Sequence, residues 1–85
     1  MPMADDFRAE LGARLGRAQR QGRTHVEVNA GELHRALGGY PGSAHQMPTC
    51  CSVMRQEFDA AKDEIIHEPI SGQGASLTIR YAVPR

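Results

Sequence analysis

The last third of the chain places the strongest constraint on its fold. Residues 63–69 and 77–83 are two strand-like runs on either side of a polar, glycine-containing segment at residues 70–76. Apolar side chains alternate along the second run at Leu77, Ile79, Tyr81 and Val83. Such alternation is typical of a strand with one buried face. The segment therefore predicts a β-hairpin that closes one side of a small domain.

The first third predicts a helix over residues 4–21 and a short strand over residues 24–28. Apolar residues recur at helical spacing in the helix, at Phe7, Leu11, Leu15 and Ala18. Its start is acidic and its end is rich in arginine, which complements the helix dipole. Gly12 and Gly16 weaken this helix, and their spacing predicts a flat stripe approached closely by another element. The strand is expected to pair with the hairpin.

The middle of the chain predicts two further helices joined by a turn. Asn29 can cap the second helix through its side-chain oxygen, and the glycines and proline of residues 38–42 end it. Pro48 suits the first turn of the third helix. The buried stripe of that helix is expected at Cys51, Met54 and Phe58.

Length and composition predict one α+β domain over residues 1–85 with a modest core. A chain of this size buries only about 60–65% of its unfolded surface, so an enzyme-sized cleft is not expected. The composition, 40% hydrophobic and 24% charged, is that of a folded domain. Neither a membrane-spanning run nor a secretory leader is recognisable. Two adjacent cysteines, Cys50 and Cys51, form no disulfide framework, so a reducing, cytoplasmic location is expected.

The charges are segregated along the chain although the formal net charge is zero. Residues 8–35 contain six arginines and three glutamates, whereas residues 45–68 contain two basic and five acidic residues. Phosphate neutralisation supplies most non-specific affinity for nucleic acid. An acidic third helix therefore predicts weak DNA binding unless the chain dimerises or lies beside another domain.

The order of helix, strand, helix, turn, helix and hairpin resembles a bacterial winged helix-turn-helix domain. The resemblance covers nearly the whole chain, chiefly residues 26–38 and 48–58 with a hairpin wing at residues 70–76. It implies three helices, a short first strand and a C-terminal wing. It also implies binding to double-stranded DNA, with the third helix in the major groove and the wing on the neighbouring backbone.

A second similarity lies in residues 31–42 and 47–51, which are similar to small domains associated with bacterial restriction-type or HNH endonucleases. It implies a DNA-targeting or accessory module with a nuclease partner, as an alternative to a role in transcription regulation. The nuclease motif itself does not occur in the chain, and no catalytic residue is carried over.

The winged-helix resemblance implies two sets of DNA contacts. Polar residues at the start and on the outer face of the third helix would contact base edges: His45, Gln46, Thr49, Ser52, Arg55 and Gln56. Residues of the first helix and the hairpin would contact the backbone: Arg14, Arg17, Arg20, Arg23, Ser71, Gln73, Ser76 and Arg80. The alternative interpretation of both sets is a solvated surface.

Metal binding and catalysis are not expected. Four histidines and two cysteines could supply ligands, but their spacing does not match that of structural zinc sites. Each histidine lies in a different predicted element, so no Cys–His nucleophile pair is indicated. We therefore expect no metal, no cofactor and no enzymatic activity.

The rival hypothesis is a protein-interaction or dimerisation module of the same fold. The Gly12 and Gly16 stripe and the apolar last strand could form a symmetric homodimer interface. The acidic third helix could meet a basic partner, with Tyr40 or Met47 as exposed apolar contacts. Steep salt dependence of binding would favour DNA over this alternative.

Overall fold

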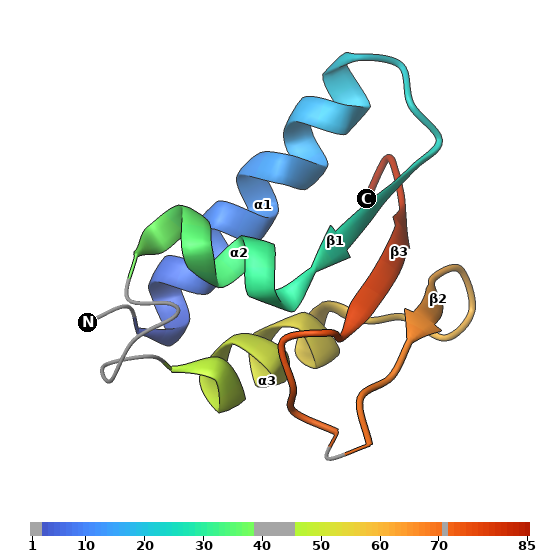
Figure 1. Cartoon of the computed structure of the whole chain (residues 1–85). Coiled ribbons are helices and arrows are strands. Elements are labelled where there is room, and N and C mark those ends of the chain that lie inside the picture. The colour runs from blue at the N-terminus through green and yellow to red at the C-terminus, as the bar shows by residue number, and fades with distance from the viewer. Residues whose placement is uncertain (1–2, 39–45, 71) are drawn as a thin grey trace.

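In the computed structural model, which describes residues 3–38, 46–70 and 72–85, three helices pack on a three-stranded antiparallel sheet (Figure 1). The elements in chain order are α1 (Ala4–Arg20), β1 (His25–Asn29), α2 (Ala30–Leu37), α3 (Met47–Glu57), β2 (Glu64–His67) and β3 (Thr78–Ala82). The fold is therefore a small, compact α+β domain, as the sequence predicts. The described part contains no helix that is long and apolar enough to cross a membrane.

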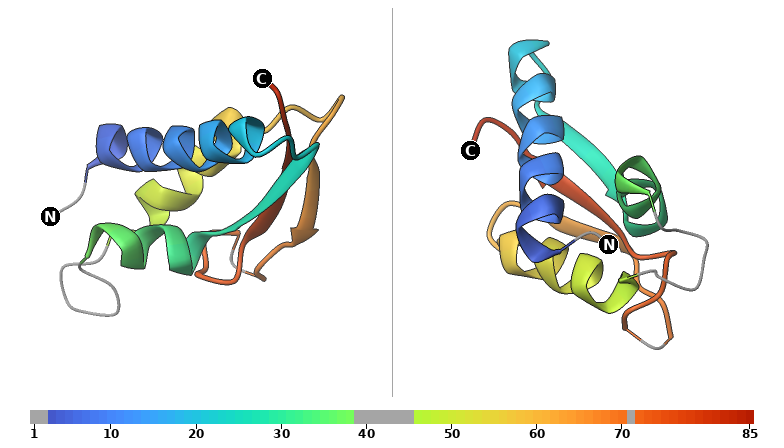
Figure 2. Two further views of the ribbon diagram at one scale, coloured as in Figure 1. Left: turned by 90° about the horizontal axis from the view of Figure 1, so that it is seen from above. Right: turned by 90° about the vertical axis from the view of Figure 1, so that its left-hand side faces the viewer.

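The sheet has the strand order β1-β3-β2, so the last strand lies in its centre. Ile79 of β3 pairs with Val28 of β1 and with Ile65 of β2. A bulge interrupts the β2 register between Ile65 and His67. The predicted hairpin and its pairing with the first strand are thus confirmed. All three helices lie on one side of this sheet (Figure 2).

The ends of α2 follow from local chemistry. The Asn29 side-chain oxygen accepts a hydrogen bond from the Glu32 backbone N–H at 3.1 Å, which confirms the predicted N-cap. Helix α2 ends at Leu37, and Gly38 follows with φ of 86°. That left-handed conformation is one that glycine adopts without steric cost.

The core lies between the helices and the inner face of the sheet. The Tyr81 hydroxyl donates to the Met54 carbonyl oxygen at 2.8 Å, so the buried tyrosine keeps a hydrogen-bond partner. The predicted inward-facing hairpin residues are all buried: Leu77, Ile79, Tyr81 and Val83. Cys51 and Met54 of α3 are buried, and Phe58, which follows the helix, is half-buried. Met47 is 5% exposed, so its predicted role as an exposed docking residue is wrong.

The expectation that another element covers Gly12 and Gly16 is wrong for this chain. Gly12 is exposed, and a Cβ placed there would meet no heavy atom within 4 Å. Only the end of the Arg20 side chain would lie near a Cβ at Gly16, at 3.3 Å. The stripe is therefore open.

Because Gly12 is exposed within a helix, Gly12→Ala is expected to raise the free energy of unfolding by about 1 kcal/mol. Urea denaturation followed by circular dichroism measures the change. Gly31→Ala is the control, since a Cβ there would lie 3.2 Å from both the Ala75 Cβ and the Ala75 carbonyl oxygen. An equal gain at the two positions would contradict the assignment of Gly12 as an open site.

Candidate nucleic-acid interface

The outer face of α3 carries the polar residues that the sequence proposes as base contacts. Helix α3 packs against α1 and α2, and Cys50, Cys51, Val53 and Met54 are buried on its inner side. The opposite side presents half-buried or exposed polar side chains: Thr49, Ser52, Arg55 and Gln56. The prediction of which side of this helix is buried and which side faces outward is confirmed.

Arg55 connects α3 to the hairpin loop. Its guanidinium donates to the Gly72 carbonyl oxygen at 2.7 Å and lies 2.9 Å from the Glu68 carboxylate. The Arg55 side chain is 33% exposed. Both contacts are made by Nη2, so this nitrogen of the Arg55 guanidinium is engaged within the chain.

Two further contacts fasten the same loop to the helices. The Cys51 thiol lies 3.4 Å from the Gly74 carbonyl oxygen, to which it can donate a weak hydrogen bond. The Gly31 backbone N–H, in the first turn of α2, donates to the Ala75 carbonyl oxygen at 3.0 Å. The loop that the sequence predicts as a wing therefore lies against α2 and α3, and Gln73 and Ser76 are exposed on it.

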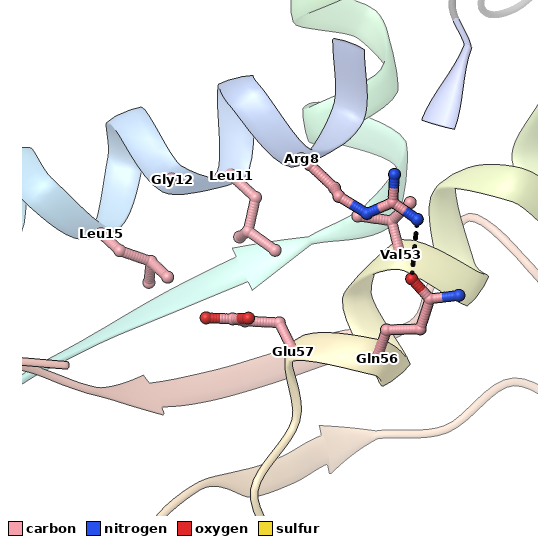
Figure 3. Close-up of a pocket in the computed structure, with 7 residues that line it drawn as sticks. All are labelled: Arg8, Leu11, Gly12, Leu15, Val53, Gln56 and Glu57. Carbon is pink, nitrogen blue, oxygen red and sulfur yellow. Dashed lines mark hydrogen bonds between the residues drawn. The ribbon is translucent and has the colours of Figure 1, made fainter. Parts of the chain in front are cut away.

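The remaining residues proposed for base contact differ in whether their side chains form hydrogen bonds within the chain. The Gln56 side-chain oxygen accepts from Arg8 at 3.0 Å, across the space between α3 and α1 (Figure 3). The Thr49 hydroxyl donates to the Gln46 side-chain oxygen at 3.4 Å. Within the described ranges, Ser52 makes no side-chain hydrogen bond. His45 and Ser71 lie outside the described residues.

Arg80 lies in β3 and not in the loop. Its guanidinium lies 3.0 Å from the Glu27 carboxylate and 3.3 Å from the Glu64 carboxylate. These carboxylates come from the two strands that flank β3. The charge of Arg80 is therefore compensated across the sheet, which disfavours its proposed contact with a phosphate.

The arginines proposed as backbone contacts lie away from α3. Arg14 pairs with Glu10 at 3.1 Å and is 25% exposed. Arg17, Arg20 and Arg23 are exposed at the far end of α1 and in the turn that follows it. In two views this end of the molecule lies opposite α3 and the hairpin loop (Figures 1 and 2). The structure therefore divides the predicted DNA contacts between two separate surfaces.

The two cysteines are structural. Burial raises the pKa of Cys50 to about 12, assisted by the neighbouring Cys51, and burial also raises the pKa of Cys51. Cys50 is fully buried, and its thiol lies 3.5 Å from the Ala30 carbonyl oxygen. Among the described residues, no three His, Cys, Asp or Glu side chains gather as a metal site.

The thiolate is the reactive form of cysteine, so the native protein is expected to react with a thiol reagent far more slowly than the unfolded protein. The rates with 5,5′-dithiobis(2-nitrobenzoic acid) in buffer and in urea provide the test. Fast labelling of either cysteine under native conditions would contradict the burial of both thiols.

Asp63 and Arg85 form a buried ion pair that sequence reasoning does not identify. Two hydrogen bonds join the guanidinium to the carboxylate, at 2.8 and 2.9 Å. The Asp63 side chain is fully buried, and its oxygens also accept the backbone N–H groups of Asp59 and Ala82. Burial raises the pKa of Asp63, but the hydrogen bonds from Arg85 and from the two backbone N–H groups outweigh this effect and leave the pKa below its usual value.

An open groove runs between α1 and α3. Leu11 and Leu15 extend from α1 toward α3, and Val53 lies opposite them (Figure 3). Arg8, Gln56 and Glu57 form its polar rim. The groove has a volume of about 150 Å³. It continues past Gly12 toward Gly16 and Arg85 in a second hollow.

Comparison of the chain with protein-family models, curated proteins and solved structures gives no match.

Proposed function

We propose that this protein binds double-stranded DNA as a winged-helix domain. Helix α3 would enter the major groove, and the loop between β2 and β3 would lie beside it on the backbone. The element order, the central position of β3 and the packing of α2 against α3 support this proposal. No metal or cofactor takes part in it.

The observation that carries the proposal is the attachment of the loop to α3. A wing and a recognition helix must keep a fixed relation if both are to contact one duplex. Arg55 supplies such a link through the Gly72 carbonyl oxygen and Glu68, and Cys51 and Gly31 add two more anchors. The outer face of α3 and the exposed residues of the loop thus form a preorganised surface, which lowers the entropic cost of binding.

The same contacts change the role proposed for Arg55. With its guanidinium engaged by the loop, Arg55 acts as a positioning residue, and its replacement should weaken binding to all sequences alike. Direct contact with bases then falls to other polar residues of this surface that are half-buried or exposed. These are Gln46 just before α3, Thr49 and Ser52 on α3, and Gln73 and Ser76 in the loop.

A negative charge at Ser52 tests the surface directly. Ser52→Glu is expected to weaken duplex binding at least tenfold, because a carboxylate would face the phosphates. Fluorescence anisotropy with a labelled mixed-sequence duplex, at about 50 mM and then 200 mM salt, measures affinity and its salt dependence. Ala60→Glu is the control, since it adds the same charge at an exposed turn beyond α3. Equal weakening of duplex binding by both variants would contradict the proposal that DNA binds at the outer face of α3.

The open groove favours a second candidate, a dimerisation module that pairs two copies of α1. Small residues form the face of α1 beside the groove: Ala9, Gly12 and Ala13 are exposed, and Gly16 is half-buried. Asp5 and Arg20 lie within about 60° of each other around the helix, at its two ends. An antiparallel second copy would place Asp5 of each α1 beside Arg20 of the other, so the face is complementary to itself in charge.

Gly12→Leu distinguishes this candidate, because the position has space in the monomer but would block close helix approach. Analytical ultracentrifugation at two concentrations should show a dimer that the substitution converts to monomer. Gly12→Ala, which adds a single methyl group, is the milder control. A monomer at both concentrations for the unsubstituted protein would reject the dimerisation module.

A further inference from the structure

The end of the domain formed by the last turn of α1 and the following turn carries uncompensated positive charge. We call this the basic end; it comprises Arg17, Arg20 and Arg23. All three side chains belong to exposed residues. Across the described ranges of the chain, none of them forms an ion pair. Arg17 and Arg20 in the last turn of α1 interact favourably with the negative end of the helix dipole. Arg23 lies beyond the helix, so the dipole does not explain its position.

Two carboxylates of α1 and β1 are engaged by arginines outside the basic end. Glu10 pairs with Arg14 at 3.1 Å, and Glu27, which lines the hollow described below, pairs with Arg80 at 3.0 Å. In the described part of the chain, neither carboxylate forms an ion pair with Arg17, Arg20 or Arg23. The positive potential of the basic end therefore persists although the formal net charge of the chain is zero.

A hollow of about 170 Å³ lies within this charged region, between α1 and β1. Ala18 and Val26 contribute apolar surface to it. The other lining residues are Arg14, Arg17, Gln21 and Arg23, which carry hydrogen-bond donors, and Glu27, which is paired with Arg80. The three arginines favour an oxyanion as ligand, because arginine can bind phosphate oxygens with two parallel hydrogen bonds.

We propose that the basic end is a second nucleic-acid site, which binds the sugar-phosphate backbone independently of α3. Arg17 and Arg20 lie one turn apart in α1, and Arg23 follows in the turn after the helix. Exposed guanidinium groups gathered in this way can contact neighbouring phosphates of a charged backbone. The inference shares its ligand class with the proposed function but rests on a separate surface.

The separation of the two surfaces makes the inference testable on its own. The basic end and the α3–loop surface lie at opposite ends of the molecule in Figure 1 and in the right-hand view of Figure 2. Effects of substitutions at distant sites without shared contacts normally add. A substitution at one surface should therefore leave binding at the other surface unchanged.

The experiment measures the slope of log affinity against log salt for a fluorescein-labelled mixed-sequence duplex. Arg17→Ala with Arg23→Ala should reduce the magnitude of that slope by about 2, since each lost phosphate contact removes about 0.9. The control, Arg8→Ala with Lys62→Ala, removes the same net charge elsewhere and should leave the slope nearly unchanged. Circular dichroism and urea denaturation confirm that both variants are folded.

Two of the possible outcomes separate the second site from the α3 proposal, and a third overturns both. If the basic-end variant reduces the slope while Ser52→Glu has no effect, the inference stands and the α3 proposal fails. If Ser52→Glu weakens binding while the basic-end variant behaves like its control, the α3 proposal stands and the second site is overturned. If the unsubstituted protein does not bind at tens of micromolar concentration in low salt, both are overturned.

Discussion

Replacement of Asp63 by alanine is expected to lower the free energy of unfolding by about 3–5 kcal/mol, because it removes the buried carboxylate that makes two hydrogen bonds with the Arg85 guanidinium. Arg85 is 14% exposed, and it would keep only the more exposed Glu57 carboxylate and two backbone carbonyl oxygens as partners. The substitution also removes the acceptors of the Asp59 and Ala82 backbone N–H groups. One side chain thus holds the segment after α3, the end of β3 and Arg85 together.

Urea denaturation of Asp63→Ala measures this loss, with Glu57→Ala as the matched control. Glu57 also pairs with Arg85, at 3.2 Å, but its side chain is 46% exposed. An exposed pair of this kind contributes about 0.2–1 kcal/mol. If Asp63→Ala does not fold, Asp63→Asn in a Gly12→Ala background keeps the transition measurable. Equal effects at positions 57 and 63 would contradict the buried character of the Asp63–Arg85 pair.

Stability should also fall in acid, because the pKa of Asp63 is lower in the folded than in the unfolded state. A lowered folded pKa makes the contribution of the carboxylate complete above the unfolded pKa. That contribution is then lost as the pH falls from about 4 through the folded pKa. Urea midpoints measured between about pH 3 and pH 7 should decline more steeply for the unsubstituted protein than for Asp63→Asn. Parallel curves would exclude Asp63 as a source of acid sensitivity.

Local patterns predicted the secondary structure well because they act over a few residues. The Asn29 cap, the stop at Gly38 and the alternation of Leu77, Ile79 and Tyr81 each depend on neighbours in sequence. The same reasoning assigned the buried and exposed sides of α3. It could not identify the Asp63–Arg85 pair, because these residues lie 22 positions apart and meet only through the fold.

The residues predicted to bind DNA also depend on tertiary contacts that local sequence patterns do not reveal. Sequence reasoning proposed Arg55 as a base contact because it lies on the outer side of the predicted third helix. The structure instead gives its guanidinium two partners from the hairpin loop, which packs against α3. Gly12 and Gly16 predicted close packing, but small residues permit close approach without supplying the partner. Tertiary contacts therefore decide which predicted polar residues stay available to a ligand.

Phe7→Ala is expected to lower the free energy of unfolding by about 3–5 kcal/mol, since it removes a fully buried aromatic side chain and leaves a cavity. The Phe7 ring meets the His34 ring edge-on, with centroids 5.0 Å apart. His34 is also fully buried, and its Nε2 accepts the Gln46 backbone N–H at 2.7 Å. Phe7 thus packs α1 against the histidine that joins α2 to the start of α3.

Phe58→Ala is the matched control, because the other phenylalanine of the chain is only half-buried. Its replacement should cost less, as less apolar surface and a smaller cavity are involved. Urea denaturation compares the two, and a Gly12→Ala background again keeps Phe7→Ala measurable. Because domains of this size are stabilised by only about 0.05–0.15 kcal/mol per residue, the loss at Phe7 should bring the domain close to unfolding. Losses of equal size at the two phenylalanines would show that Phe7 does not form the centre of the helical core.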